Sequence, residues 1–194
     1  MAVNTSIPGW MTFRELDVIE LLAAQVPENG LVVEVGCFLG RSAWAWSQSI
    51  PQSARLVCID PWYMGYENYG KVYFEELEPK FPRLHGEGSF DSLQEFKANM
   101  KDCSNLEIIQ AISPQGIKWD GRKIDALFLD GDHSLQSMLE NFEFWLPHMQ
   151  NTGIICGHDY RGPFRGVVES VNQVASRLKK EVKVFERTSI WQIL

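Results

Sequence analysis

Three short apolar runs in this sequence end abruptly in glycine and polar residues. They cover residues 31–35, 124–129 and 154–157. Apolar runs of this length, separated by segments with helical periodicity, are typical of strands that are buried on both faces of a parallel sheet. Ligands of such sheets gather at the carboxyl ends of the strands. We therefore expect an α/β fold with its site where these three runs end.

The order of the elements predicts one Rossmann-like, doubly wound domain over residues 1–194. Its seven-stranded sheet is expected to be mostly parallel, with an antiparallel hairpin at the C-terminus. The strands are predicted at residues 31–35, 55–59, 106–109, 124–129, 154–157, 182–185 and 190–194. Helices are predicted after caps at Thr12, Asp91 and Ser134, from Ser113–Pro114, and at residues 41–49 and 164–179.

Two segments lie outside this regular alternation. Residues 1–29 are expected to form an N-terminal arm followed by a helix. Residues 61–89 are irregular and rich in aromatic side chains, which favours a lid or a substrate-binding loop. The tyrosines of that segment are equally compatible with the packing of a short helix.

Composition and charge narrow the class of partner. The chain has a net charge of −7 and no long run of lysine or arginine. This disfavours binding to nucleic acid or to anionic membranes, because both need clustered positive charge. The four cysteines form no C-x-x-C pair, and we recognise no signal peptide or membrane span. We therefore expect a cytoplasmic protein in a reducing compartment.

The turn after the first predicted strand has the features of a nucleotide site. Gly36 permits a tight turn and Gly40 permits close approach of the backbone to a ligand. Their G-x-x-x-G spacing differs from that of dinucleotide sites, and Phe38 takes the place of the glycine that admits a pyrophosphate. Asp60 ends the second strand, where a carboxylate can accept hydrogen bonds from ribose hydroxyls. A ligand with a ribose and no pyrophosphate fits best, although the glycines alone are also compatible with a plain turn.

The segment Glu34-x-Gly36-x-x-x-Gly40-x-Ser42 resembles the first motif of class I S-adenosylmethionine-dependent methyltransferases, in particular the metal-dependent O-methyltransferase branch. The resemblance extends over roughly residues 30–194. It implies S-adenosylmethionine as cofactor, with the methionine part near Gly36, the ribose at Asp60 and the adenine near Ser113. A helix N-cap explains Ser113 equally well. The implied donor-binding residues are Glu34, Gly36, Phe38, Gly40, Ser42, Asp60, Ser113 and Asp130.

Asp130, His133 and Asp159 extend the resemblance to the reacting groups. The segments that contain them are similar to the macrocin O-methyltransferase type and to the group known as methyltransferase family 24. This resemblance implies that Asp130 and Asp159 bind Mg²⁺ or a similar divalent cation, and that His133 is the catalytic base. In the catechol-type enzymes a lysine takes the position of His133.

The chemistry of these residue types agrees with that assignment. An alcohol is a poor nucleophile at neutral pH, so its methylation requires loss of the hydroxyl proton. A hard cation bound by carboxylates lowers the pKa of a coordinated hydroxyl, and a nearby imidazole can accept the proton. The acidic residues Asp130 and Asp159 can also be read as turn or capping carboxylates.

Several neighbouring residues keep more than one interpretation. Asp132 is either an outer ligand or, as we favour, an aid to Ser134 in capping the next helix. His158 is a further metal ligand, a residue of the site wall or, as we favour, a residue that contacts Asp159 without contacting the metal. Tyr160 replaces the asparagine of the catechol-type metal site, which leaves a third ligand to Glu67, Glu87 or water. Residues 161–166 are expected to shape the acceptor pocket, where Arg165 either holds an anionic acceptor or is solvated.

The leading hypothesis is an S-adenosylmethionine-dependent, metal-assisted O-methyltransferase acting on a small hydroxylated molecule. One alternative is a metal-independent N- or C-methyltransferase, and another is a methyltransferase-like domain that binds without catalysis. The identity of the acceptor and the oligomeric state, including a homo-oligomer, stay open.

Overall fold

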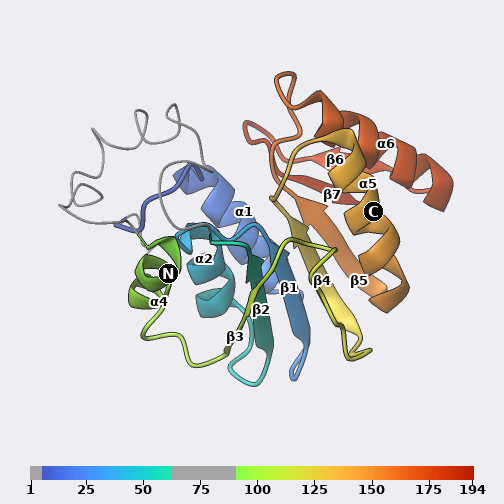
Figure 1. Ribbon diagram of the computed structural model, residues 1–194. Helices are drawn as coiled ribbons and strands as arrows, with labels where there is room; N and C mark the ends of the chain where they lie inside the picture. Colours follow the sequence, from blue (N-terminus) through green and yellow to red (C-terminus); the bar gives the residue numbers. More distant parts are fainter. Residues whose placement is uncertain (1–5, 63–90) are drawn as a thin grey trace.

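The computed structural model describes residues 6–62 and 91–194. At its centre is a seven-stranded sheet with the order β3-β2-β1-β4-β5-β7-β6 (Figure 1). The strands are β1 Leu31–Val35, β2 Arg55–Asp60, β3 Leu106–Gln110, β4 Ile124–Leu129, β5 Met149–Gly157, β6 Val182–Val184 and β7 Trp191–Ile193. Strands β1 to β5 pair in parallel, and β7 runs antiparallel to both β5 and β6. The predicted fold class and the C-terminal hairpin are confirmed.

Helices cover both faces of the sheet (Figure 1). The described helices are α1 Phe13–Ala23, α2 Arg41–Ser49, α4 Ser92–Asn99, α5 Leu135–Trp145, the short 3-10 helix η2 Leu146–His148, and α6 Arg165–Leu178. Strand residues alternate between two cores: Val32 and Phe128 pack with α1, α2 and α4, whereas Val33 and Leu127 pack with α5 and α6. Every residue of β1 is buried because helices lie on both sides of it.

Local capping signals set the starts of three helices as predicted. Thr12 and Glu15 form a reciprocal capping box at α1. Asp91 accepts hydrogen bonds from two backbone N–H groups at the start of α4, and Ser134 accepts one at the start of α5. Each side chain satisfies donors that the first turn of a helix leaves unpaired.

The predicted helix start at Ser113–Pro114 is wrong, because residues 113–116 form a turn. The Ser113 hydroxyl donates to Asn141 Oδ1 at 2.6 Å and accepts from Trp145 Nε1 at 3.1 Å. A hydroxyl engaged by these α5 side chains does not cap a following helix. This turn joins β3 to the segment that precedes β4 without a helix.

Strand β5 begins at Met149, earlier than predicted. Its pairing with β4 shifts register between Ile124 and Ala126, so the residues that resemble a turn, 151–153, lie inside the strand as an irregularity. Of the predicted lid at residues 61–89, only residues 61 and 62 are among those described.

The arm before α1 packs onto the turn that follows β1. Ile7 is buried against Leu39, and the rings of Trp10 and Phe38 lie 5.2 Å apart. Arg41 Nη1 donates to the carbonyl oxygen of Gly9 at 2.9 Å. The arm therefore extends the wall formed by the turn that follows β1. Among the described helices, none is long and apolar enough to cross a membrane.

Gly157→Ala should destabilise the fold. A Cβ at Gly157 would lie 2.3 Å from Leu129 O and 2.4 Å from Trp191 Cζ2, so both neighbouring strands must shift. We expect a loss of about 1–3 kcal/mol in the free energy of unfolding, measured with urea. Gly162→Ala is the control, because a Cβ there meets nothing within 4 Å. Equal unfolding midpoints for the two variants would contradict this packing.

Candidate active site

A cavity of about 940 Å³ lies at the carboxyl ends of β1, β2, β4 and β5. It is lined by most of the residues predicted for donor, metal and base: Gly36, Phe38, Ser42, Asp60, Ser113, Asp130, His133 and Asp159. Glu34 and Gly40, also predicted to bind the donor, do not line it. The fold therefore places most of the predicted donor-binding residues and the predicted metal and base residues around one cavity.

The first turn can approach β4 closely because it begins with glycine. Gly36 has a φ of 88°, and a Cβ there would lie only 2.1 Å from Asp130 O. The Gly36 N–H donates to Ile59 O at 2.8 Å, and the Asp130 N–H donates to Val35 O at 2.8 Å. Backbone contacts alone therefore make the turn after β1 a neighbour of Asp130, the first of the predicted metal ligands.

Glu34 lies beneath this turn and is fully buried. The Ser42 hydroxyl donates to its Oε1, and Oε2 makes no hydrogen bond with a described residue. Burial raises the pKa of Glu34 to about 8, although the bond from Ser42 acts in the opposite direction. Glu34 therefore lies beneath the turn that follows β1, and its raised pKa keeps the carboxyl group protonated near pH 7.

Asp60 connects the end of β2 to the turn that follows β1. Its Oδ2 accepts from the Phe38 N–H at 2.9 Å, and its Oδ1 accepts from the Trp62 N–H at 2.8 Å. Both donors belong to residues with positive φ, 45° at Phe38 and 41° at Trp62. A carboxylate oxygen can accept two hydrogen bonds, so these contacts are compatible with additional bonds from a ribose.

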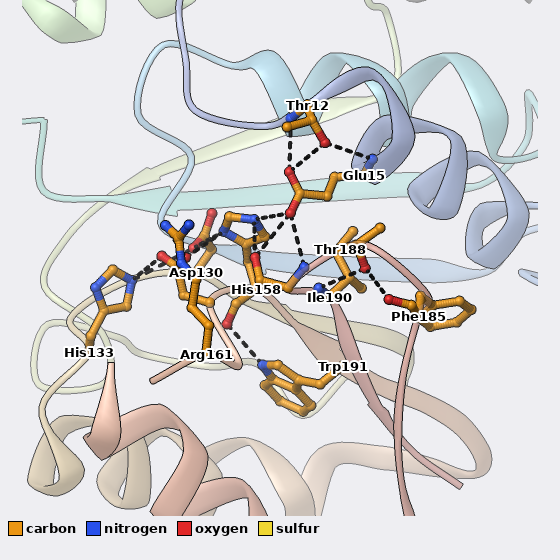
Figure 2. A network of polar contacts seen from close by, with 12 residues as sticks. Thr12, Glu15, Asp130, His133, His158, Arg161, Phe185, Thr188, Ile190 and Trp191 are labelled. Carbon is orange, nitrogen blue, oxygen red and sulfur yellow. Dashed lines mark hydrogen bonds and ion pairs between the residues drawn. The ribbon is translucent and has the colours of Figure 1, made fainter. Parts of the chain in front are cut away.

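Asp130, His133 and Asp159 converge at the other end of the cavity, and Figure 2 labels the first two of them. One ligand atom from each lies within 4.8 Å of the others. His133 Nε2 is 3.3 Å from Asp159 Oδ2 and 3.8 Å from Asp130 Oδ1. Burial lowers the pKa of His133, but the nearby carboxylates of Asp130 and Asp159 favour the charged imidazole and outweigh it, so that the pKa is raised overall. The three predicted reacting groups are thus close together.

His158 fills the space between this cluster and α1. Its Nδ1 lies 3.4 Å from Asp130 Oδ1 and 3.5 Å from Asp159 Oδ1, and its Nε2 lies 3.1 Å from Glu15 Oε1. Burial disfavours the charged imidazole, yet the negative charge of Asp130 and hydrogen bonds to the surrounding carboxylates raise the pKa of His158 to about 12. The ring contacts both predicted metal ligands, which agrees with a supporting role.

The residues that flank the cluster separate into three roles. Asp132 Oδ1 accepts from the Ser134 N–H at 2.7 Å, which places Asp132 at the start of α5, as favoured from the sequence. Arg161 Nη2 lies 2.9 Å from Asp159 Oδ1, and its guanidinium lies over the Phe164 ring. Arg161 and Phe164 line the cavity, whereas Arg165 is exposed and does not.

The cluster has the donor set of a divalent-metal site. His133 Nε2 and Asp159 Oδ1 are buried without a hydrogen bond to any described residue, although Asp159 Oδ1 has its ion-pair contact with Arg161. The carboxylate oxygens of Asp130 and Asp159 suit a hard divalent cation such as Mg²⁺ or Mn²⁺, and the imidazole of His133 lies beside them. Glu67 and Glu87, considered as further ligands, lie outside the described residues.

Three features of the site were not found by sequence reasoning. Glu15 was recognised only as a capping residue, and its contact with His158 joins positions 143 apart. Residues 8–11 of the arm line the cavity, and their sequence contains no signal for that role. Arg161 was expected in the acceptor segment, but its ion pair with Asp159 was not predicted.

Glu34→Gln should change the pH dependence of stability. In the folded protein Glu34 keeps its proton up to about pH 8, whereas in the unfolded chain it loses the proton near 4.5. The folded state binds more protons between these values, so this group makes stability fall as pH rises from the lower value to the upper. The glutamine variant should lose that part of the fall, measured by urea unfolding across the window. An unchanged pH profile would contradict a protonated Glu34.

Solved methyltransferases share this fold. A precorrin-6y C5,15-methyltransferase from Geobacter metallireducens GS-15 is 11% identical, with a TM-score of 0.62 over 99% of this chain and 90% of its own. A methyltransferase from Geobacter sulfurreducens is 18% identical, with a TM-score of 0.59 over 94% and 79%. The O-methyltransferase TomG from Streptomyces achromogenes is 16% identical, with a TM-score of 0.59 over 95% and 80%. At these identities the likeness is one of fold.

The sequence itself matches a family described as a methyltransferase domain, family 24, over residues 33–160. No curated protein is similar enough in sequence to count as a match. The matched range begins just before Glu34 and ends just after Asp159, so it spans both ends of the cavity. The chain therefore belongs to this family of S-adenosylmethionine-dependent methyltransferase domains.

Proposed function

We propose that this protein transfers the methyl group of S-adenosylmethionine to a hydroxyl group of a small molecule, with a divalent cation and His133 as base. The observation that carries the proposal is the convergence of Asp130, His133 and Asp159 within 4.8 Å in the cavity that the donor motif also lines. Donor-binding and proton-accepting groups then face one space.

The donor occupies the part of the cavity formed by the first turn and by Asp60. Gly36 leaves room for the methionine part, and the Asp60 carboxylate accepts hydrogen bonds from the ribose. Ser113 borders the adenine. These contacts come from strand ends and tight turns, which hold the donor in line with the acceptor hydroxyl.

The acceptor occupies the part near His133 and Phe164. Asp130 and Asp159 would hold the cation, which would supply a lower pKa for an acceptor hydroxyl bound to it. His133 Nε2 is buried beside the two carboxylates, so an acceptor hydroxyl would reach it at the cation, while the side chain as a whole is 28% exposed and its ring lies 4.4 Å from the Phe164 ring. That packing orients Nε2 to take the hydroxyl proton.

The size of the cavity and the named neighbours bear on the acceptor. A volume of about 940 Å³ accommodates the donor together with a small acceptor. TomG is an O-methyltransferase and was solved with S-adenosylmethionine, whereas the precorrin enzyme is named for methylation at C5 and C15. Since both share the fold, the choice of oxygen rests on the cluster of Asp130, His133 and Asp159.

His133→Ala should abolish turnover while leaving donor binding intact. Loss of a general base lowers the rate by about 10²–10⁴-fold. Release of S-adenosylhomocysteine, followed with a panel of catechols, phenols and sugars, measures turnover, and calorimetry measures donor binding. His148→Ala is the matched control, because His148 does not line the cavity. Asp60→Ala should behave in the opposite way and weaken donor binding. Joint loss of turnover and donor binding in His133→Ala would contradict a role as base.

Treatment with EDTA should remove activity, and Mg²⁺ or Mn²⁺ should restore it. Without the cation the acceptor hydroxyl keeps its ordinary pKa and is not oriented by the carboxylates of Asp130 and Asp159. The same turnover assay measures the effect before and after metal is returned. Full activity in EDTA would instead favour methyl transfer to nitrogen or carbon without a metal.

A further inference from the structure

Both nitrogens of the His158 ring face carboxylates (Figure 2). On one side Nε2 lies 3.1 Å from Glu15 Oε1, and on the other Nδ1 lies between Asp130 and Asp159. The side chains of His158 and Glu15 are only 5% and 8% exposed. Glu15 belongs to α1, outside residues 33–160 that match the family. Helix α1 therefore contacts the site, although it lies outside the part of the chain that matches the family.

Hydrogen bonds hold the Glu15 carboxylate from two sides. Its Oε2 accepts from the Thr12 N–H and hydroxyl, each at 2.8 Å. Its Oε1 accepts from the Ser189 N–H at 3.1 Å and from the Ser189 hydroxyl at 3.0 Å. The Ser189 hydroxyl also lies 2.9 Å from His158 Nε2, and an Nε2–H that donates to Glu15 Oε1 leaves the lone pair of Nδ1 for a cation held by the aspartates. Glu15 thereby fixes which nitrogen of the ring faces the aspartates.

The distances at Nδ1 fit a shared centre better than a direct ion pair. A charge-assisted N–H···O bond is about 2.7–2.9 Å long, whereas Nδ1 lies 3.4 Å from Asp130 and 3.5 Å from Asp159. Two ligand atoms about 2.1 Å from one metal, at an angle near 90–110°, lie roughly 3.0–3.5 Å apart. Nδ1 is therefore spaced from both oxygens as ligands of one ion are spaced, and binding of the ion would release the proton that these carboxylates otherwise favour on Nδ1.

We propose that Glu15 is a positioning residue of the metal site. It holds His158 through Nε2, so that Nδ1 joins Asp130 and Asp159 as a third ligand atom and His133 stays available for the acceptor proton. Metal-binding histidines commonly donate their other ring N–H to a carboxylate, which fixes the tautomer and the orientation of the ring. This inference rests on the proposed metal dependence, and it supplies the ligand that Tyr160, in place of asparagine, leaves missing.

Glu15→Gln should weaken Mn²⁺ binding by about 10- to 100-fold, because the ring of His158 loses its acceptor. Calorimetric titration of the full chain with Mn²⁺ measures this, and titration with S-adenosylhomocysteine should give unchanged affinity. Asp17→Asn is the matched control: it removes the charge of an exposed carboxylate on the same helix that does not line the cavity. That variant should bind Mn²⁺ like the wild type.

A double-mutant cycle separates positioning from a structural effect. His158→Asn should weaken Mn²⁺ binding, and adding Glu15→Gln to it should cause no further loss, since among the described residues His158 is the one that links the Glu15 side chain to Asp130 and Asp159. The inference would be overturned if the double mutant lost Mn²⁺ affinity by the product of the two single losses. Wild-type Mn²⁺ affinity in Glu15→Gln, or loss of S-adenosylhomocysteine binding in that variant, would also overturn it. A wild-type chain that binds no Mn²⁺ would instead refute the proposed metal dependence itself.

Discussion

Parallel pairing of β4 with β1 on one side and with β5 on the other brings the site together. Leu129 at the end of β4 pairs with Val35 and with Gly157. The residues that follow these three therefore meet at one edge of the sheet, where the Asp130 N–H donates to Val35 O and the His158 N–H donates to Leu129 O. The donor turn and the metal-binding candidates are adjacent because the register of three strands makes them so.

The elements that local sequence determines were predicted well. Strand β4 was predicted with the bounds that it has, because a run that is apolar except for Asp125 ends there at the charged Asp130. The capping box of Thr12 and Glu15 similarly marked the start of α1. The failures have a tertiary cause. Ser113 has a good capping side chain, but Asn141 and Trp145 from another helix engage it. The early start of β5 depends on pairing with Ile124, which no local pattern reveals.

The same division applies to the candidate site. Asp130, His133 and Asp159 follow directly after strands, so the sequence predicted their proximity, and the structure places them within 4.8 Å. Glu15 could not be found in this way, since its local pattern concerns only Oε2, whereas Oε1 contacts a residue 143 positions away. Sequence periodicity cannot predict a long-range contact that a side chain makes through an atom not used by its local motif.

The central claim is that the donor and a divalent cation share the cavity at the ends of β1, β4 and β5. A crystal structure with S-adenosylhomocysteine and Mn²⁺, with the ion located by its anomalous scattering, tests it most directly. We predict a manganese peak between Asp130 and Asp159, with the donor product against the Gly36 turn and the ribose at Asp60. Bound S-adenosylhomocysteine without a manganese peak at these carboxylates, at saturating metal, would contradict the account.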